Sequence, residues 1–217
     1  MINIALDGPA GSGKSTVAKF LAEKLNILYL DTGALYRAVA LYALNCDVDV
    51  ENERQVQPLL NTLDVSVEYK DGKQITLLCG KDVSKEIREN RVSKSASKIS
   101  ALKCVREKLL TLQREIASSM DCILDGRDIG TFVLPNANYK FFLTASVDCR
   151  ATRRYKELLE CGCEVDYNQL KSEIEERDYR DSHREIAPLK KADDAVEIDT
   201  SALTVEQVCQ EVLKRIK

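Results

Sequence analysis

The sequence predicts an α/β fold, in which a doubly wound, five-stranded parallel sheet is flanked by helices and carries a small antiparallel β insertion. Two observations predict it. Short apolar runs alternate with segments of helical periodicity along most of the chain, as in parallel sheets with crossover helices. One central segment instead alternates with period two around an Asp-Gly turn, as in an antiparallel hairpin. The 217 residues are enough for a core domain with a small inserted one.

The N-terminal part of the chain predicts two strand–helix pairs. Residues 2–6 are apolar, as in a buried parallel strand, and the glycine-rich segment 8–13 follows them directly. A helix is expected over residues 14–25, where apolar side chains recur at helical spacing. A second short strand is expected over 27–30 and a second helix over 34–44, which completes a strand–helix–strand–helix pattern.

The middle of the chain follows a different pattern. Residues 64–69 alternate between apolar and polar side chains, and residues 75–78 form a matching second run. The segment Lys70-Asp71-Gly72-Lys73 between them predicts a hairpin turn, because Asp-Gly tolerates positive φ. An antiparallel hairpin within a parallel α/β pattern indicates an insertion, which we place at about residues 62–90.

The parallel pattern resumes after the insertion. Further strands are expected over residues 122–125, 139–143 and 195–198. Further helices are expected over residues 91–99, 102–118, 148–160, 166–181 and 204–216. Together with the two N-terminal strands, these strands make up the five of the predicted parallel sheet.

Composition limits the possible partners. The formal net charge is −3, with 44% apolar and 31% charged residues, which is ordinary for a soluble globular protein. This balance gives no sign of nucleic-acid or membrane binding, so any anion site must come from a local cluster of positive charge. No apolar run approaches the ~20 residues of a membrane helix, and the N-terminus resembles a strand more than a signal peptide. We expect a cytoplasmic protein whose eight scattered cysteines are reduced.

One motif defines the chemistry. Residues 8–15 match the P-loop pattern G-x-x-x-x-G-K-[ST], and they lie after an apolar strand and before a helical segment, as the mechanism requires. The glycines let backbone N–H groups turn inward around a phosphate, and the helix dipole points at the same anion. Lys14 can reach the β- and γ-phosphates, and the Ser15 hydroxyl can ligate Mg²⁺. We expect ATP and Mg²⁺ to bind at Gly8, Pro9, Ala10, Gly11, Ser12, Gly13, Lys14, Ser15 and Thr16.

Several arginines indicate an acceptor that is itself a phosphate. Such an acceptor is largely ionised at neutral pH and needs no base, but bringing two polyanions together calls for converging guanidinium groups. Arg127 follows a strand at its carboxyl end, where α/β sheets bind ligands. The other candidates are Arg37, Arg106, Arg150, Arg153, Arg154, Arg177, Arg180 and Arg184, of which Arg177 and Arg184 share one predicted helix face with Asp181. The two helices near the C-terminus also carry glutamates, so the sequence leaves open whether their arginines bind substrate or form ion-paired, solvated faces.

Three other classes of P-loop protein compete with this interpretation. A kinase for a small hydroxyl metabolite, such as shikimate or gluconate, is disfavoured by the inserted hairpin and the many arginines. A guanine-nucleotide switch would need an Asn-Lys-x-Asp motif, which the chain lacks. A nucleic-acid-associated ATPase is disfavoured by the nearly neutral charge and the absence of tryptophan.

Four motifs, in order, resemble those of the bacterial cytidylate kinase family, and the resemblance covers nearly the whole chain. The motifs are LDGPAGSGKST at 6–16, DTGALYR at 31–37, DGRDIGT at 125–131 and ERDYRDSHR at 176–184, the last followed by Ala187-Pro188-Leu189. The resemblance implies a monomeric nucleoside monophosphate kinase that moves the γ-phosphoryl group of MgATP to the 5′-phosphate of CMP or dCMP. It implies a P-loop core domain of residues 1–61 and 91–217 with a short helical lid at about 150–188. It also implies a monophosphate-binding insertion at 62–90, whose adjoining helix runs to about residue 100.

The resemblance also implies a role for individual residues. The phosphate of the acceptor would be held by Thr32, Arg37 and Arg127. The cytosine edge would be read by Ser97, Arg106 and Asp128, since a carboxylate can accept from N4 and the other two can donate to ring acceptors. The sugar would lie near Arg177 and Asp181, and the lid would contribute Arg150, Arg154 and Arg184. The groups expected to act on the transferring phosphoryl are Lys14, Arg127, Arg150 and Arg154.

Overall fold

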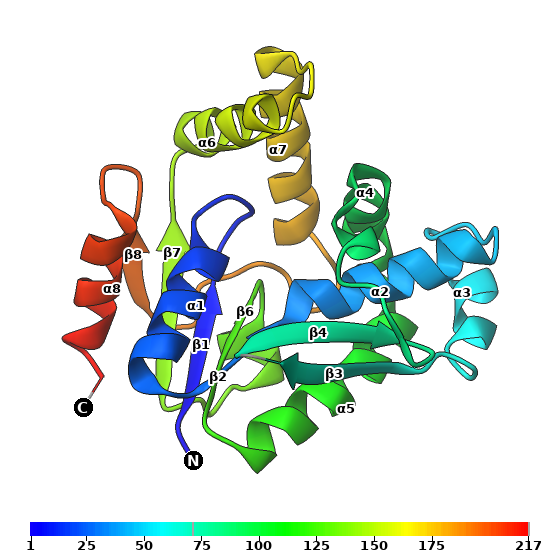
Figure 1. Ribbon diagram of the computed structural model, residues 1–217, viewed down its shortest axis with the longest axis horizontal. Helices are drawn as coiled ribbons and strands as arrows, with labels where there is room; N and C mark the ends of the chain where they lie inside the picture. The colour runs from blue at the N-terminus through cyan, green and yellow to red at the C-terminus, as the bar shows by residue number, and fades with distance from the viewer. Residues whose placement is uncertain (71, 217) are drawn as a thin grey trace. The chain divides into compact units, whose positions relative to one another are not determined.

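A computed structural model describes residues 1–70 and 72–216 and confirms the predicted parallel sheet (Figure 1). Five strands form one sheet in the order β2-β6-β1-β7-β8. They are β1 (Asn3–Asp7), β2 (Leu28–Asp31), β6 (Cys122–Gly126), β7 (Tyr139–Thr144) and β8 (Val196–Asp199). β1 and β7 run parallel with Ile4 opposite Tyr139, and β7 and β8 run parallel with Phe141 opposite Val196. The crossovers between these strands are helical, as in a doubly wound fold.

The helices follow the sequence pattern closely. They are α1 (Lys14–Leu25), α2 (Thr32–Asn45), α3 (Glu53–Leu59), α4 (Asn90–Ile99), α5 (Lys103–Ser119), α6 (Val147–Glu160), α7 (Tyr167–Ser182) and α8 (Val205–Leu213). α1 has the predicted bounds because Gly13 opens it and Asn26 closes it in the left-handed conformation, with φ of 53°. α8 begins at a capping box, in which Thr204 and Gln207 satisfy each other's backbone N–H groups. α3 was not expected from the sequence.

The predicted antiparallel hairpin is also confirmed. β3 (Val65–Lys70) pairs with β4 (Lys73–Leu78), with Val65 opposite Leu78, and a short third strand, β5 (Lys81–Asp82), extends the small sheet. Asp71, in the predicted turn, lies outside the described residues. β5 and the 3₁₀ turn at Glu86–Arg88 were not expected, because both are too short to produce a periodic signal.

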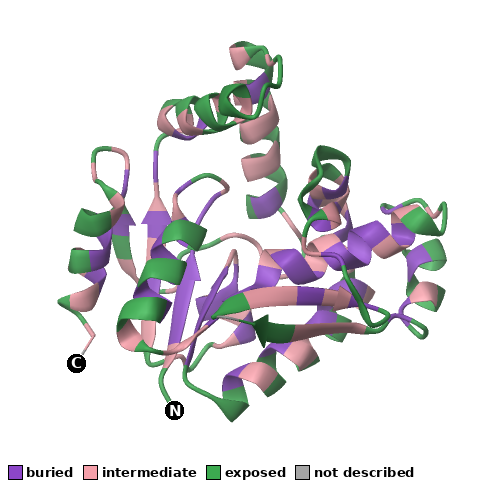
Figure 2. Ribbon diagram, viewed as in Figure 1, coloured by how far each residue is buried: buried purple, intermediate pink, exposed green. Residues whose placement is uncertain are grey.

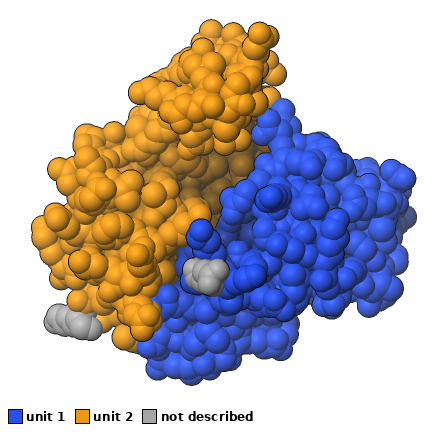
Figure 3. Space-filling model, in the orientation of Figure 1, with its two compact units in different colours: residues 1, 27–122 blue, residues 2–26, 123–217 orange. Residues whose placement is uncertain are grey.

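The chain divides into two compact units (Figure 3). The first unit comprises Met1 and Ile27–Cys122, and the second comprises Ile2–Asn26 and Ile123–Lys217. In the first unit, buried apolar side chains gather around α2, which packs against α4, α5 and β4. In the second unit, β1 is buried from Ile4 onward and α1 packs against α8 (Figure 2). Each unit therefore has an apolar core of its own, which holds the site residues described below.

Two further features concern the whole of the described chain. Among residues 1–70 and 72–216, no helix is long and apolar enough to cross a membrane. The eight cysteines are free, and Cys122 and Cys209 are buried. Burial raises the pKa of both of these thiols, to about 12 for Cys122 and about 11 for Cys209, so they are poor nucleophiles at neutral pH.

Candidate functional site

The glycine-rich loop of the second unit connects β1 to α1 and is shaped to hold an anion. Gly8 has φ of 145°, and a Cβ there would lie 1.9 Å from the carbonyl oxygen of Leu143 on β7, so only glycine fits. Gly13 has φ of 89° and opens α1, which leaves the first N–H groups of that helix available to a ligand. Thr200, after β8, donates to the carbonyl oxygen of Ser12 at 3.0 Å and so supports the loop from the other side. The loop therefore has the shape expected of the phosphate cradle that the motif predicts.

Lys14 is buried in this cradle, with an exposed fraction of 5%. Its Nζ donates to the carbonyl oxygen of Pro9 at 2.6 Å and to Ser12 Oγ at 3.3 Å. Burial lowers the pKa of Lys14 well below its ordinary value, and repulsion from Arg127 adds to the effect. A bound polyphosphate would reverse this trend by supplying negative charge beside the ammonium group.

A hydroxyl and a carboxylate meet at the start of α1. Ser15 Oγ donates to Asp125 Oδ2 at 2.5 Å, and Asp125 is buried near the carboxyl end of β6. These are oxygen donors, as Mg²⁺ prefers, and the pairing of a P-loop hydroxyl with a strand-end aspartate suits a metal held against nucleotide phosphates. The residues therefore fit the expected metal. We did not select Asp125 from the sequence, although an apolar strand that ends in aspartate was the available signal.

Arginines from two segments of the second unit converge on one buried carboxylate. Arg127 Nε donates to Asp181 Oδ2 at 2.9 Å, and Arg177 Nε lies 3.9 Å from the same oxygen. Burial alone would raise the pKa of Asp181, but the charges of Arg127, Arg177 and Arg184 outweigh it and hold that pKa below its ordinary value. These three arginines therefore act on Asp181. Arg184 does so from beyond the helix, because α7 ends at Ser182, which corrects its expected place on the helix face.

The arginines of α6 lie in different surroundings. Arg150 is buried and joins three segments: it donates to Ala145 O at 2.9 Å, to Ala10 O of the glycine loop at 3.1 Å and to Asp178 of α7 at 2.5 Å. Arg154 is exposed and pairs with Glu157 at 3.1 Å. In this conformation Arg150 fixes the glycine loop to α6 and α7, and Arg154 lies on a solvated face.

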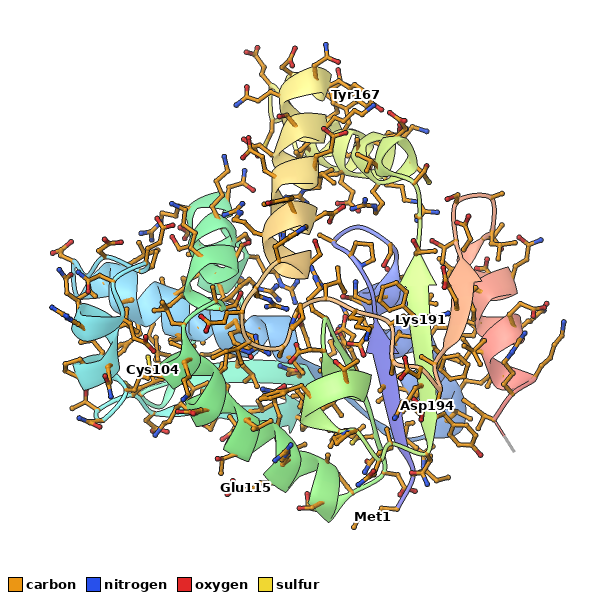
Figure 4. The ribbon with its side chains drawn as sticks, turned by 180° about the vertical axis from the view of Figure 1, so that it is seen from behind. Met1, Cys104, Glu115, Tyr167, Lys191 and Asp194 are labelled. Carbon is orange, nitrogen blue, oxygen red and sulfur yellow. The ribbon has the colours of Figure 1, made fainter. Side chains whose placement is uncertain are left out.

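α6 and α7 form a packed pair within the second unit. Tyr167, at the start of α7, packs edge to face on Tyr155 of α6, with ring centroids 5.7 Å apart (Figure 4). Arg153 turns from α6 toward the loop after β8 and donates to the carbonyl oxygen of Thr200 at 2.6 Å. The helix pair expected to form the lid is thus bound to the glycine loop by Arg150 and to the loop after β8 by Arg153.

In the first unit, Thr32 and Arg37 lie on the first two turns of α2, which begins where β2 ends. Asp31 caps α2 by accepting from the Ala34 N–H at 3.0 Å, and its second oxygen accepts from Arg37 Nη2 at 2.8 Å. Gln74 of β4 holds the Asp31 backbone, since its Oε1 accepts from the Asp31 N–H at 2.7 Å and its Nε2 donates to Asp31 O at 3.4 Å. The small sheet therefore fixes the end of β2, directly before the helix that carries these two residues. Neither Asp31 nor Gln74 was selected from the sequence.

Ser97 and Arg106 also lie close together in the first unit. Arg106, with an exposed fraction of 2%, donates from Nη1 to Ser100 O at 3.1 Å, and Ser100 Oγ donates to Ser97 O at 3.0 Å. The guanidinium carbon of Arg106 lies 5.7 Å from the ring centroid of Tyr36. Ser97 Oγ is buried and has no hydrogen-bond partner among the described residues. A hydroxyl on α4 and a guanidinium on α5 are thus both removed from water, as recognition of a polar base edge requires.

Asp7 is a buried carboxylate that sequence analysis did not select. Its Oδ1 accepts from the Ile129 N–H at 2.8 Å and its Oδ2 accepts from the Gly130 N–H at 2.7 Å. These amides open a π-helical turn at Ile129–Val133, directly after Asp128. Burial raises the pKa of Asp7 to about 7, although the two amides act in the opposite sense.

The raised pKa predicts that stability falls as pH rises from about 4 to about 7. In this window the folded protein keeps a proton on Asp7 that the unfolded chain has lost, so the free energy of unfolding falls with pH, by up to about 4 kcal/mol from this group. Denaturant unfolding at several pH values should show this slope in the wild type and not in Asp7→Asn. Asp181, whose pKa is lowered, titrates below this pH window. Lys14, whose pKa is also lowered, is present in both proteins, so the comparison includes its titration on both sides. Parallel curves for the two proteins would contradict the raised pKa.

Comparison with known proteins gives one family over nearly the whole chain. Residues 4–217 match the family model described as cytidylate kinase. The chain is 49% identical to a cytidylate kinase of Caldicellulosiruptor saccharolyticus, covering 98% of this chain and 94% of the relative. It is 47% identical to a cytidylate kinase of Lactobacillus johnsonii, covering 100% of this chain and 94% of the relative. Among solved structures, a shikimate kinase from Bacteroides thetaiotaomicron has a TM-score of 0.51 at 14% identity, covering 99% of this chain and 98% of that structure. At this identity the match shows likeness of fold alone.

Proposed function

This chain belongs to the cytidylate kinase family, and on that premise we propose how its own residues transfer the γ-phosphoryl group of ATP to the 5′-phosphate of CMP or dCMP. The products are ADP and CDP or dCDP. The family match over residues 4–217 carries the proposal, because it includes each motif on which the site depends. From the same membership we propose that the protein acts as a cytoplasmic monomer on small nucleotides and on no nucleic acid.

The second unit supplies the residues for ATP. Apart from Pro9, which has no N–H, residues 8–16 offer backbone N–H groups to the phosphates, and the Lys14 ammonium lies against the β- and γ-phosphates. Ser15 and Asp125 would hold Mg²⁺, which would neutralise charge on the phosphate oxygens. The 2.5 Å contact between these two side chains supports this role, because it already brings the two oxygen donors together.

The proposed contacts of the acceptor nucleotide are given for each unit by itself. In the first unit, Thr32 and Arg37 bind its phosphate, and Ser97 and Arg106 donate to the cytosine ring. In the second unit the proposed contacts are Arg127 with the phosphate, Asp128 with the cytosine amino group, and Arg177 and Asp181 with the sugar. The burial of Ser97, Arg106 and Asp128 supports their assignment, because a buried donor or acceptor discriminates strongly among bases.

Transfer then needs charge neutralisation more than proton removal. The acceptor phosphate is largely ionised at neutral pH, so its oxygen attacks the γ-phosphorus in line while the bond to the β-phosphate oxygen breaks. Lys14, Arg127, Arg150, Arg154 and Arg184 stabilise the charge on the transferring group. Arg150 lies between the glycine loop and α7, which supports a role in closing the lid and excluding water.

The test is steady-state ADP production with MgATP and a panel of acceptors. We expect strong turnover with CMP and dCMP and little with UMP, AMP, GMP or shikimate. Turnover with AMP or UMP equal to that with CMP would reject the cytosine contacts and retain a monophosphate kinase. No turnover with any nucleotide would leave only ATP binding by the glycine loop.

A further inference from the structure

The carboxylate of Asp7 has no contact role in the proposed reaction, yet it is among the most enclosed charged groups of the second unit. It ends β1 and directly precedes Gly8 of the glycine loop. Its two oxygens accept from two successive backbone N–H groups, those of Ile129 and Gly130, at 2.8 and 2.7 Å. One side chain therefore ties the strand that leads into the glycine loop to the segment that follows Arg127 and Asp128.

The tied segment depends on this carboxylate for its first hydrogen bonds. The carbonyl oxygen of Asp128 accepts from the N–H groups of Phe132 and Val133 at 2.8 and 3.1 Å, so the later amides of the turn are satisfied within it. The first amides of a helical turn have no such partner and need a cap. Asp128 does not cap the turn with its own side chain. The side chain of Asp7, at the end of β1, caps the turn instead.

The side chain of Lys140 on β7 also lies close to this segment. A Cβ at Gly130 would lie 3.4 Å from Asp7 Oδ2 and 3.2 Å from the Lys140 side chain of β7, so the backbone approaches both closely. Lys140 Nζ is anchored by Asp194 at 2.8 Å, on the segment that leads into β8 (Figure 4). The charged groups that act on the pKa of Asp7 are Asp128, which raises it, and Lys14, which lowers it.

We propose that Asp7 is a positioning residue for the acceptor nucleotide, which fixes the backbone that carries Arg127 and Asp128 and does not itself touch ATP or CMP. The inference rests on the proposed function, because it takes Arg127 and Asp128 as acceptor contacts. The proposal predicts different effects on the two substrates. Weakening the hydrogen bonds from Ile129 and Gly130 to Asp7 displaces the acceptor contacts and leaves the phosphate cradle of the glycine loop in place.

The test is Asp7→Asn, which keeps the shape of the side chain but offers a good acceptor to only one of the two amides. We expect the KM for CMP to rise about ten-fold, as for the loss of one buried, charge-assisted hydrogen bond. We expect the KM for ATP to stay within about two-fold. An equal rise for both substrates, a rise for ATP alone, or no change would overturn the proposal.

Two further variants separate the possible causes. Val212→Ala removes buried volume from α8 of the same unit, and a purely structural role of Asp7 would give the same kinetic pattern as this control at matched loss of stability. Arg127→Ala tests the proposed function itself. If it leaves the KM for CMP unchanged, the assignment of the segment to the acceptor fails; if it raises that KM while Asp7→Asn does not, only the role of Asp7 fails.

The pH profile of the KM for CMP gives a second readout, to be set beside the pH dependence of stability of the same two proteins. A protonated Asp7 and an asparagine both offer one good acceptor, so the difference in KM for CMP between wild type and Asp7→Asn should shrink as pH falls below about 7. Titration of the CMP phosphate affects both proteins equally and cancels in this comparison. A difference that stays constant from pH 8 to pH 6 would count against the positioning role.

Discussion

Replacing Lys14 with alanine is expected to lower the turnover number at saturating ATP and CMP by about 10³ or more. Lys14 is the one lysine of the glycine loop motif, and its ammonium is buried against Pro9 O and Ser12 Oγ. A positive charge in such a water-poor cradle stabilises the developing charge on the transferring phosphoryl far more than it would in water. Steady-state ADP production, followed at several concentrations of each substrate, measures the loss.

Two companion variants identify the cause of that loss. Lys14→Met keeps the apolar stem and removes only the charge, so it should be as inactive as Lys14→Ala. Lys19→Ala removes the same charge from the exposed face of α1, within two turns, and should remain active. Thermal unfolding of the ligand-free variants separates a collapsed loop from a lost charge, because Lys14 also bonds the loop backbone. Turnover of Lys14→Met within ten-fold of wild type would reject Lys14 as the charge that stabilises transfer.

The parts of this fold that the sequence predicts well are those defined by local signals. The predicted and observed bounds of α1 agree at both ends, because the helix begins after a glycine loop and ends before Asn26, which adopts the left-handed conformation. The β3–β4 hairpin follows from strict alternation around an Asp-Gly pair. α3 was missed because it is short, polar and contains Pro58, which lowers any helical signal.

The residues that the sequence could not identify act across the fold. Asp7 reaches Ile129 and Gly130, more than 100 positions away, and Ser15 reaches Asp125 across a similar separation. Such pairs depend on which strands adjoin in the sheet, and the strand order cannot be read from periodicity. The π-helical turn after Asp128 has no sequence signature either, since its first amides are satisfied by a distant side chain.

The arginines also show that sequence spacing does not predict the surroundings of a side chain. Sequence spacing placed Arg177, Asp181 and Arg184 on one helix face, and the structure does bring their charges together, but it ends α7 before Arg184. Arg150 and Arg154 are four positions apart, so spacing could not distinguish them. Arg150 is buried between three segments, and Arg154 is exposed beside Glu157. Burial by tertiary contacts decides which of these arginines is held in place, and helical periodicity alone does not contain that information.

Replacing Arg106 is expected to damage the use of CMP and to spare ATP. The side chain is almost completely buried on the first turns of α5, where it bonds Ser100 O and lies near the ring of Tyr36. Cytosine presents acceptors at N3 and O2, and an acceptor buried without a donor is rejected strongly. For Arg106→Met, which keeps most of the buried volume, we expect kcat/KM for CMP to fall by about 10² or more, with the KM for ATP unchanged.

The choice of methionine matters because Arg106→Ala would also open a cavity in the core of the first unit. Arg114→Met, on the exposed face of the same helix, is the matched control and should leave both substrates unaffected. The ratio of kcat/KM for CMP to that for UMP is the decisive readout, because loss of a donor to N3 and O2 removes the preference for cytosine, while a general loss of folding lowers both values together. If Arg106→Met keeps that ratio and the KM for CMP, the donor that reads cytosine must be sought elsewhere, first at the buried Ser97 hydroxyl.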